Sequence, residues 1–252
     1  MKSPALIAVI PAAGQGSRLG TRLPKFFVEI KDGLRICDIL LARVAAVTRD
    51  VHLVLSPEGL DHFEGLGRPA PPGVRVTCSV QQQPRGMGDA VFGACGYWCT
   101  ARHLLIVWGD QLGVSGKTLA RTASQQCGST APSMTLPLVH SQEPYVHYEL
   151  NAGTLIRVAQ AREGDECPPR GLSDVGTFAV SAEGLDAAWQ RYLSEPESRG
   201  ARTGEINLLP FFAHLARREG FAVQIVDVAD AAEARGVNTH EDLAYFRAVP
   251  GS

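Results

Sequence analysis

Short apolar runs alternate with helix-like segments through roughly the first half of the chain, and this alternation limits the folds open to it. Strand-like runs fall at 6–10, 51–55, 74–80 and 103–109. The clearest helix is expected over 34–48, where apolar residues recur three and four positions apart. Such alternation predicts an α/β fold, a mainly parallel, Rossmann-like sheet with helices on both faces. Ligands of these sheets bind beyond the carboxyl ends of the strands.

After about residue 130 the pattern changes to strands joined by turns, followed by helices. The sequence predicts a β-hairpin within 145–160, with "NAG" at 151–153 as its turn. Further strands are expected within 133–141, 172–181 and 221–228, and helices near 184–194, near 206–219 and from about 238. We expect a single domain over 1–252 with two halves, about 1–130 and about 131–252.

Composition narrows the classes of function. The chain of 252 residues has a formal net charge of −2, which gives no general surface for nucleic acid. No apolar stretch approaches the roughly 18 residues of a membrane helix, and no signal-peptide pattern opens the sequence. Its six cysteines form no CxxC pair, which favours reduced thiols. We therefore expect a cytoplasmic protein without nucleic-acid or membrane partners; a homo-oligomer is left open.

The segment "IPAAGQGSRLGTRLPKFF" (10–27) directly follows the first strand-like run. Its glycines read G-x-G-x-x-x-G, which misses the dinucleotide fingerprint by one residue, and Pro24 would interrupt a helix begun there. Backbone N–H groups freed by glycines, with the cations Arg18, Arg22 and Lys25, suit a triphosphate. The alternative is a glycine-rich surface turn with solvated cations.

The same segment resembles the signature of the sugar-phosphate nucleotidylyltransferases, A-[AG]-G-x-G-[ST]-R followed by P-K. The resemblance is strongest to the uridylyltransferase branch that acts on N-acetylglucosamine 1-phosphate, and it extends to related cytidylyltransferases. Further matches follow in order over about 6–245, and together they are far more specific than any one motif. They are "QQQPRGMGDAVFGA" (81–94), "VWGDQL" (107–112), "GEINLLPFFAHLARREG" (204–220) and "EARGVNTHEDLA" (233–244). The resemblance implies a nucleotide-diphospho-sugar transferase type of fold, with a nucleotide-binding first half and an acceptor-binding second half.

The resemblance also implies roles for residues of the first half. Arg18 and Lys25 would be catalytic, with Arg18 on the β- and γ-phosphates and Lys25 between the α-phosphate and the acceptor. Gln81 and Gly86 would bind the edge of a pyrimidine base; Gln81 as a mere polar strand end is the alternative. The full set of expected nucleotide contacts is Ala12, Ala13, Gly14, Gly16, Ser17, Gln81, Gly86 and Met87.

Asp110 and Asn238 would hold Mg²⁺ by the same resemblance. One carboxylate and one amide oxygen are chemically sufficient, because Mg²⁺ completes its shell with phosphates and water. Alternatively, Asp110 caps a helix and Asn238 only turns the chain. The implied reaction needs neither a protein nucleophile nor a general base, since the acceptor oxygen is already ionised. No histidine is therefore assigned a catalytic role.

The second half departs from the family pattern where relatives hold the sugar. Tyr148 falls against a family glycine, and Gln160 and Asp174 fall near a family Glu and Asn. The expected acceptor is therefore a smaller phosphate, another sugar or cyclitol phosphate, or a phosphonate. Tyr145 and Tyr148 could cover a quaternary ammonium group of the acceptor, or they could simply pack against the sheet. The expected acceptor contacts are Tyr145, Tyr148, Glu163, Asp174 and Glu205.

The sequence thus predicts an Mg²⁺-dependent pyrimidine nucleotidylyltransferase that joins CTP or UTP to a small phosphorylated acceptor and releases pyrophosphate. One alternative is a catalytically silent nucleotide-binding regulator on the same fold. Another is an NAD(P)-dependent oxidoreductase, which the misspaced glycines disfavour. The sequence does not choose between CTP and UTP.

Overall fold

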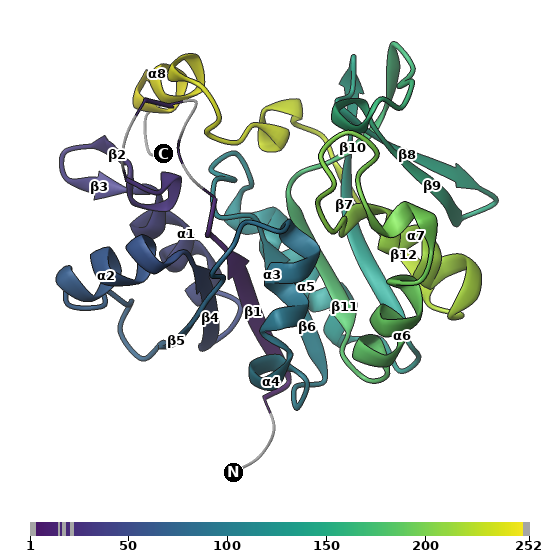
Figure 1. The fold of residues 1–252 in the computed structure, drawn as a ribbon, viewed down its shortest axis with the longest axis horizontal. Coiled ribbons are helices and arrows are strands. Elements are labelled where there is room, and N and C mark those ends of the chain that lie inside the picture. The colour runs from purple at the N-terminus through teal and green to yellow at the C-terminus, as the bar shows by residue number, and fades with distance from the viewer. Residues whose placement is uncertain (1–3, 15, 17–18, 21–22, 249–252) are drawn as a thin grey trace.

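The computed structural model describes residues 4–14, 16, 19–20 and 23–248. Across them the chain forms one mixed sheet between two layers of helices (Figure 1). In the described part this sheet has eight strands, with β12 paired to β7 and the others in the order β10-β7-β11-β6-β1-β4-β5. Their bounds are β1 (Leu6–Pro11), β4 (Asp50–Leu55), β5 (Arg75–Val80), β6 (His103–Val107), β7 (Ser133–Gln142), β10 (Arg170–Asp174), β11 (Thr177–Ser181) and β12 (Ala222–Val228).

The two halves of the sheet differ in strand direction. β5, β4, β1 and β6 are mutually parallel, so their carboxyl ends meet at one edge. β11 then runs antiparallel to both β6 and β7, and β10 also runs antiparallel to β7. The predicted α/β fold with a mixed, mainly parallel sheet is confirmed.

Both faces of the sheet are buried under helices. Along β1, Ala8 and Ile10 pack into one apolar core and Ile7 and Val9 into the other, as expected of a central parallel strand. The first core contains residues of α1 (Ile36–Ala45), α2 (Pro57–Gly65), α5 (Gly116–Cys127) and α8 (His240–Ala248). The second contains residues of α3 (Met87–Gly93), α4 (Cys95–Trp98), α6 (Leu185–Tyr192) and α7 (Leu209–Arg218).

Two small two-stranded sheets and short 3-10 turns complete the described structure. β2 (Glu29–Lys31) pairs with β3 (Leu34–Arg35), and β8 (Val146–Asn151) pairs with β9 (Thr154–Gln160). The turns are η2 (Lys25–Phe27), η3 (Ala161–Glu163), η4 (Pro196–Ser198) and η5 (Ala231–Ala234). Ala152 and Gly153 have positive φ values of 47° and 81°, which confirms the predicted hairpin turn.

The predicted strands and helices are present, with differences at their ends. The helix expected over 34–48 is shorter, because residues 34–35 pair in β3 and α1 begins at Ile36. A capping box precedes α8: Thr239 Oγ1 accepts from the Asp242 N–H at 3.2 Å and Asp242 Oδ2 accepts from the Thr239 N–H at 2.9 Å. Within the described residues, none of the helices has the length and apolar character needed to cross a membrane. A single domain over 1–252 stays a prediction.

Candidate active site

A cavity of about 500 Å³ opens at the carboxyl ends of β1 and β6. Its walls come from Pro11–Gly14 after β1, Gln81 and Gly86 after β5, Trp108–Gln111 after β6, and residues of the second half. Gly109 lets the segment after β6 approach the segment at the end of β1. A Cβ at this position would lie 2.8 Å from Ala12 Cβ and 3.0 Å from Pro11 O. The cavity therefore lies where ligands of parallel sheets bind.

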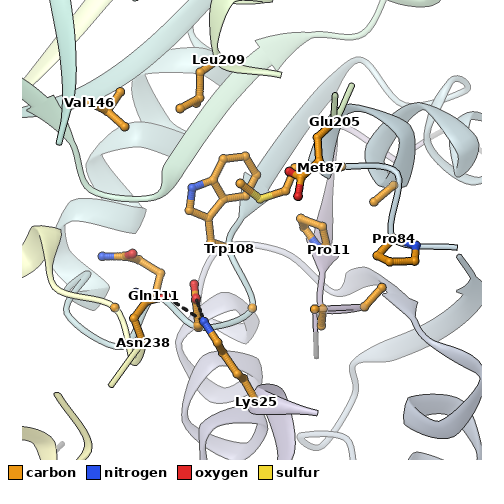
Figure 2. A pocket seen from close by; sticks show the side chains of 18 of the residues that line it. Pro11, Lys25, Pro84, Met87, Trp108, Gln111, Val146, Glu205, Leu209 and Asn238 are labelled. Atoms are coloured by element: carbon orange, nitrogen blue, oxygen red, sulfur yellow. Dashed lines mark hydrogen bonds and ion pairs between the residues drawn. The ribbon is translucent and has the colours of Figure 1, made fainter. Parts of the chain in front are cut away.

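Lys25, Asp110 and Asn238 converge on one side of this cavity (Figure 2). Lys25 Nζ donates to Asp110 Oδ2 at 3.1 Å and to Asn238 Oδ1 at 2.7 Å. The Lys25 and Asp110 side chains are 18% and 25% exposed, so the ion pair is partly shielded from water. Lys25 opens η2, which Phe26 and Phe27 anchor because both side chains are buried. Three segments far apart in the sequence thus meet at one point.

Backbone contacts hold the segment that carries Asn238 against the loop that follows β6. The Val237 N–H donates to the Asp110 carbonyl at 2.8 Å, and the Gly113 N–H donates to the Arg235 carbonyl at 2.9 Å. Asp242 accepts from the Asn238 N–H at 3.0 Å, so the α8 cap also fixes this residue. The positions of the Asp110 and Asn238 oxygens are therefore set by the backbone as well as by Lys25.

The donor set at this point fits a hard divalent cation. A carboxylate oxygen and an amide oxygen both lie within hydrogen-bonding distance of a single cationic nitrogen, and these are ligands that Mg²⁺ prefers. In the part of the chain that the structure describes, no group of three or more His, Cys, Asp or Glu is arranged for a metal. A metal held by Asp110 and Asn238 would therefore need phosphate and water oxygens as further ligands.

Gln81, Gly86 and Met87 lie together on the wall after β5. Gln81 Nε2 donates to the Gly86 carbonyl at 3.1 Å and to Asp89 Oδ2 at 2.7 Å. Gly86 has φ of 110°, and a Cβ there would lie 2.7 Å from the Ile206 carbonyl oxygen, so the backbone requires glycine. Met87 begins α3 and lies near Trp108 (Figure 2).

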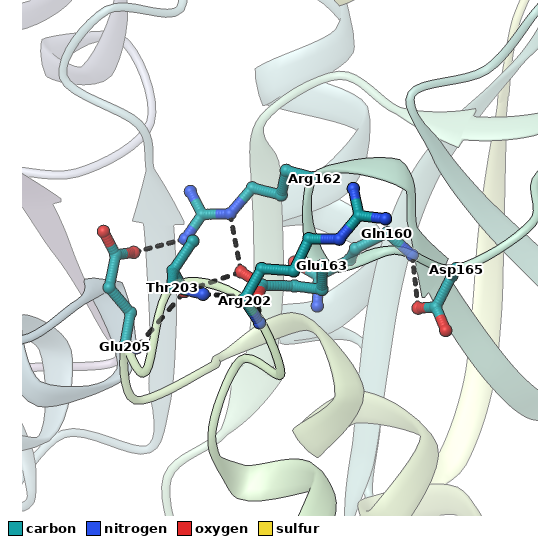
Figure 3. A network of polar contacts seen from close by, with 7 residues as sticks. All are labelled: Gln160, Arg162, Glu163, Asp165, Arg202, Thr203 and Glu205. Atoms are coloured by element: carbon teal, nitrogen blue, oxygen red, sulfur yellow. Dashed lines mark hydrogen bonds and ion pairs between the residues drawn. The ribbon is translucent and has the colours of Figure 1, made fainter.

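The acceptor half contributes a cross-linked polar network (Figure 3). The Arg162 guanidinium donates to Glu163 Oε1 at 2.9 Å and forms an ion pair with Glu205. Glu163 also accepts from Thr203 Oγ1 at 2.7 Å. Burial opposes ionisation of Glu163, but the bonds from Thr203 and Arg162 outweigh it and lower the pKa of this carboxyl to about 2. Arg162 and Glu205 line the cavity. Glu163 restrains the Arg162 side chain through the hydrogen bond between them.

Tyr145 and Asp174 line the cavity, whereas Tyr148 and Glu163 are not among the described lining residues. Tyr148 is 1% exposed in the core, because β8 turns it toward the buried side of the hairpin. Burial raises the pKa of Asp174, whose Oδ1 accepts from the Gly176 N–H at 2.8 Å. Tyr148 packs in the core and Glu163 braces Arg162, and their expected roles as acceptor contacts stay predictions.

The remaining expected contacts divide into three groups. Ala12, Ala13 and Gly14 line the cavity, whereas Gly16 is buried outside the described lining and its carbonyl accepts from the Leu19 N–H at 2.8 Å. Ser17 and Arg18 lie outside the described residues. The binding and catalytic roles of all these residues stay predictions.

Sequence reasoning missed several residues that line the cavity. Arg162 lies two positions after Gln160, and Trp108 and Gln111 flank the "GD" of the fourth strand end. Figure 2 shows Trp108 together with Val146, Leu209 and Met87 among the side chains that line the cavity. Their neighbours in the sequence pointed to this region, but only the folded chain shows which side chains face inward.

The fold and this cavity define the class of α/β proteins that bind nucleotides at strand ends, and comparisons with known proteins identify the family. Residues 8–172 match the model of the MobA-like NTP transferase domain. The chain belongs to this family, within the nucleotidyltransferase superfamily that the sequence predicted.

Among curated proteins, the chain is similar to the bifunctional protein GlmU of Acidithiobacillus ferrooxidans, with 30% identity over 245 residues. It is also 30% identical over 246 residues to GlmU of Parvibaculum lavamentivorans. Each alignment covers 96% of this chain but 51% and 52% of the relative, so the chain spans about half the length of these proteins.

Solved structures show the same fold at lower sequence identity. A structure named as a glucose-1-phosphate thymidylyltransferase of Bacillus anthracis superposes with a TM-score of 0.75 at 16% identity, covering 98% of both chains. The 4-diphosphocytidyl-2C-methyl-D-erythritol synthase of Anaerococcus prevotii superposes with a TM-score of 0.66 at 13% identity, over 97% of this chain and 95% of the other.

Proposed function

We propose that this protein is a cytoplasmic, Mg²⁺-dependent pyrimidine nucleotidylyltransferase. It joins CTP or UTP to a small acceptor that carries a phosphate or phosphonate, and it releases pyrophosphate. Membership of the NTP transferase family supports the general class. The observation that carries the proposal is the convergence of Lys25, Asp110 and Asn238 beside the walls expected to hold the nucleotide.

Asp110 and Asn238 would hold the metal, which when bound neutralises phosphate charge and orients the nucleotide. The walls formed by Ala12–Gly14 and by Gln81 and Gly86 bind the nucleoside part. Lys25 binds the α-phosphate and the anionic acceptor, and so reduces the repulsion between them. Arg18, which lies outside the described residues, has its proposed place on the β- and γ-phosphates.

The reaction needs one displacement. An ionised oxygen of the acceptor forms a bond to the α-phosphorus as the bond from that phosphorus to the bridging oxygen of the β-phosphate breaks. The leaving group carries the bonding electrons away as pyrophosphate. Since no proton has to be removed from the acceptor, positioning and charge stabilisation account for the catalysis.

The acceptor binds against the second half of the cavity. Arg162 and Glu205 offer a fixed donor and acceptor pair, and Gln160 and Asp174 add further polar groups. Trp108 and Tyr145 supply aromatic surface. This mixture suits a small polar molecule with some apolar surface. Tyr145, Asp174 and Glu205 were expected as acceptor contacts, and Trp108 and Arg162 are added to them.

A substrate panel tests the proposal. The purified chain is incubated with Mg²⁺ and each of CTP, UTP, dTTP, ATP and GTP, together with sugar phosphates, cyclitol phosphates, choline phosphate and small phosphonates, and pyrophosphate is measured. We expect release with CTP or UTP and one acceptor class, and loss of release on chelation of the metal. Release with purine nucleotides alone, or undiminished release in excess chelator, would contradict the proposal.

A further inference from the structure

The side-chain amide of Gln81 is held in one orientation by two acceptors. Its Nε2 donates to Asp89 Oδ2 at 2.7 Å and to the Gly86 carbonyl at 3.1 Å. A carboxylate and a carbonyl can only accept hydrogen bonds. If the amide were turned round, Gln81 Oε1 would face two other acceptors. The chemistry of its neighbours therefore assigns the oxygen and nitrogen of this amide.

Asp89 is itself fixed in place. It lies in the first turn of α3 with its side chain 15% exposed, and its other oxygen, Oδ1, forms an ion pair with Arg85 Nη2 at 2.8 Å. The Arg85 side chain is 64% exposed, so solvent weakens this ion pair. Asp89 and Arg85 line a second cavity of about 370 Å³, and Gln81 lines both this cavity and the nucleotide cavity. Asp89 thus reaches Gln81 without lining the nucleotide cavity itself.

Both N–H groups of the Gln81 amide are used by these two bonds. Among the described residues Oε1 makes no hydrogen bond, which leaves it for a ligand. The Gln81 side chain, which lines the proposed nucleotide cavity, therefore has a hydrogen-bond acceptor available to a ligand, while both of its N–H donors are used.

We propose that Asp89 is a positioning residue that makes Gln81 a fixed acceptor for a donor on the nucleotide base. The inference rests on the proposed function, because it takes the cavity to hold a pyrimidine nucleotide. Uracil supplies its N3–H and cytosine its N4 amino group. A base edge that has only acceptors would place one of its lone pairs opposite a lone pair of Gln81 Oε1. Such a base should bind more weakly.

The triphosphate of 2-pyrimidinone riboside tests this directly, since it lacks both the uracil N3–H and the cytosine amino group. Its dissociation constant is measured by calorimetry with Mg²⁺ and compared with that of CTP or UTP, whichever binds tighter. We expect the wild-type protein to bind the analogue about 10- to 100-fold more weakly. In Asp89→Asn only the weaker contact with the Gly86 carbonyl opposes a turned amide that donates to N3 of the analogue, so the ratio of dissociation constants should fall to a few-fold.

Two controls separate positioning from general damage. Arg85→Ala removes the outer contact of Asp89 but keeps the carboxylate, and Asp61→Asn makes the same chemical change at an exposed residue of α2. Both control variants should keep most of the wild-type ratio between the dissociation constants of the analogue and of the preferred nucleotide. Asp89→Ala should narrow the ratio as Asp89→Asn does, and kcat at saturating nucleotide should change little in either variant.

The outcomes distinguish this inference from the proposed function. An unchanged ratio in both Asp89 variants, or equal narrowing in the controls, overturns the inference. A wild-type protein that binds the analogue as tightly as its preferred pyrimidine nucleotide overturns it as well. If the wild-type protein binds neither CTP nor UTP, the proposed function itself is wrong.

Discussion

The two walls of the cavity are built in different ways. The proposed nucleotide wall lies at the ends of parallel strands, where a Cβ at Gly86 would lie 2.7 Å from the Ile206 carbonyl oxygen and one at Gly109 would lie 3.0 Å from the Pro11 carbonyl oxygen. The acceptor wall consists of side chains that hold one another, with Arg162 between Glu163 and Glu205. Positions that require glycine because neighbouring backbone lies close depend on the fold and tolerate few substitutions. A wall of side chains can be rebuilt by a few substitutions, which explains how one fold can serve many acceptors.

The largest expected effect is at Asp110, where the two walls meet. Asp110→Ala removes the anionic ligand of the proposed metal site and should lower kcat by about 1,000-fold. Circular dichroism and thermal melting should be near those of the wild type, because the Asp110 contacts with Val237 and Leu112 are made by its backbone. Full turnover in this variant would contradict the metal assignment; Asp61→Ala, the same change at an exposed residue of α2, is the matched control.

Lys25→Met should lower kcat by about 100-fold and change the KM for the nucleotide much less. The reason is that its charge is needed most when the acceptor and the α-phosphate approach each other. The same substitution at Lys31, an exposed residue of β2, should leave both constants unchanged. Equal losses in kcat and in nucleotide affinity would instead indicate a role in binding alone.

Glu163→Gln tests whether the acceptor wall depends on a buried charge. Loss of the carboxylate loosens Arg162 and should raise the KM for the acceptor about 10-fold, with the KM for the nucleotide unchanged. We also expect a loss of about 1–3 kcal/mol in the free energy of unfolding. Glu64→Gln, which breaks an exposed ion pair, should cost less than about 0.5 kcal/mol.

The same substitution should change the dependence of stability on pH. The pKa of Glu163 is lowered from 4.5 to about 2 in the folded chain. Its contribution is therefore complete above pH 4.5 and is lost as the pH falls toward 2. Denaturant titrations in this range should show a shallower decline for Glu163→Gln than for the wild type. A decline of equal slope would mean that other carboxylates dominate acid unfolding.

The smallest effect is expected at Tyr145. Its side chain is 57% exposed at the cavity, so Tyr145→Ala should raise the KM for the acceptor about 2-fold and leave stability within about 0.5 kcal/mol. A much larger rise would indicate that the ring closes over the acceptor, as in recognition of a quaternary ammonium. Kinetics with the acceptor found by the substrate panel provide the measurement.

The sequence predicted the nucleotide wall better than the acceptor wall, for a physical reason. The carboxyl ends of parallel strands meet at one edge, so the segments that carry Ala12 and Asp110 were expected there, whereas Gln81 was placed at the site by the family resemblance. The approach of Asn238 to Lys25 was expected from the family resemblance, and the structure shows it, although their roles stay predictions.

The side chains that form the acceptor wall could not be predicted from the order of sequence segments. Alternation along β8 puts Val146, Tyr148 and Leu150 on one face, but which face is covered depends on how the hairpin packs, and this is a tertiary property. The bracing of Arg162 by Glu163 likewise needs Thr203, forty positions further along the chain. Local patterns do not contain such contacts.

The bond between Lys25 and Asn238 has a consequence for synthesis of the protein. The two residues are separated by 213 positions, so a ribosome that adds about 5–20 residues per second needs about 10–40 s to pass from one to the other. During that interval the lysine has been made but its later partner does not exist. If Lys25 and Asn238 act as proposed, nascent chains emerge before the site can form, and activity is gained late in translation.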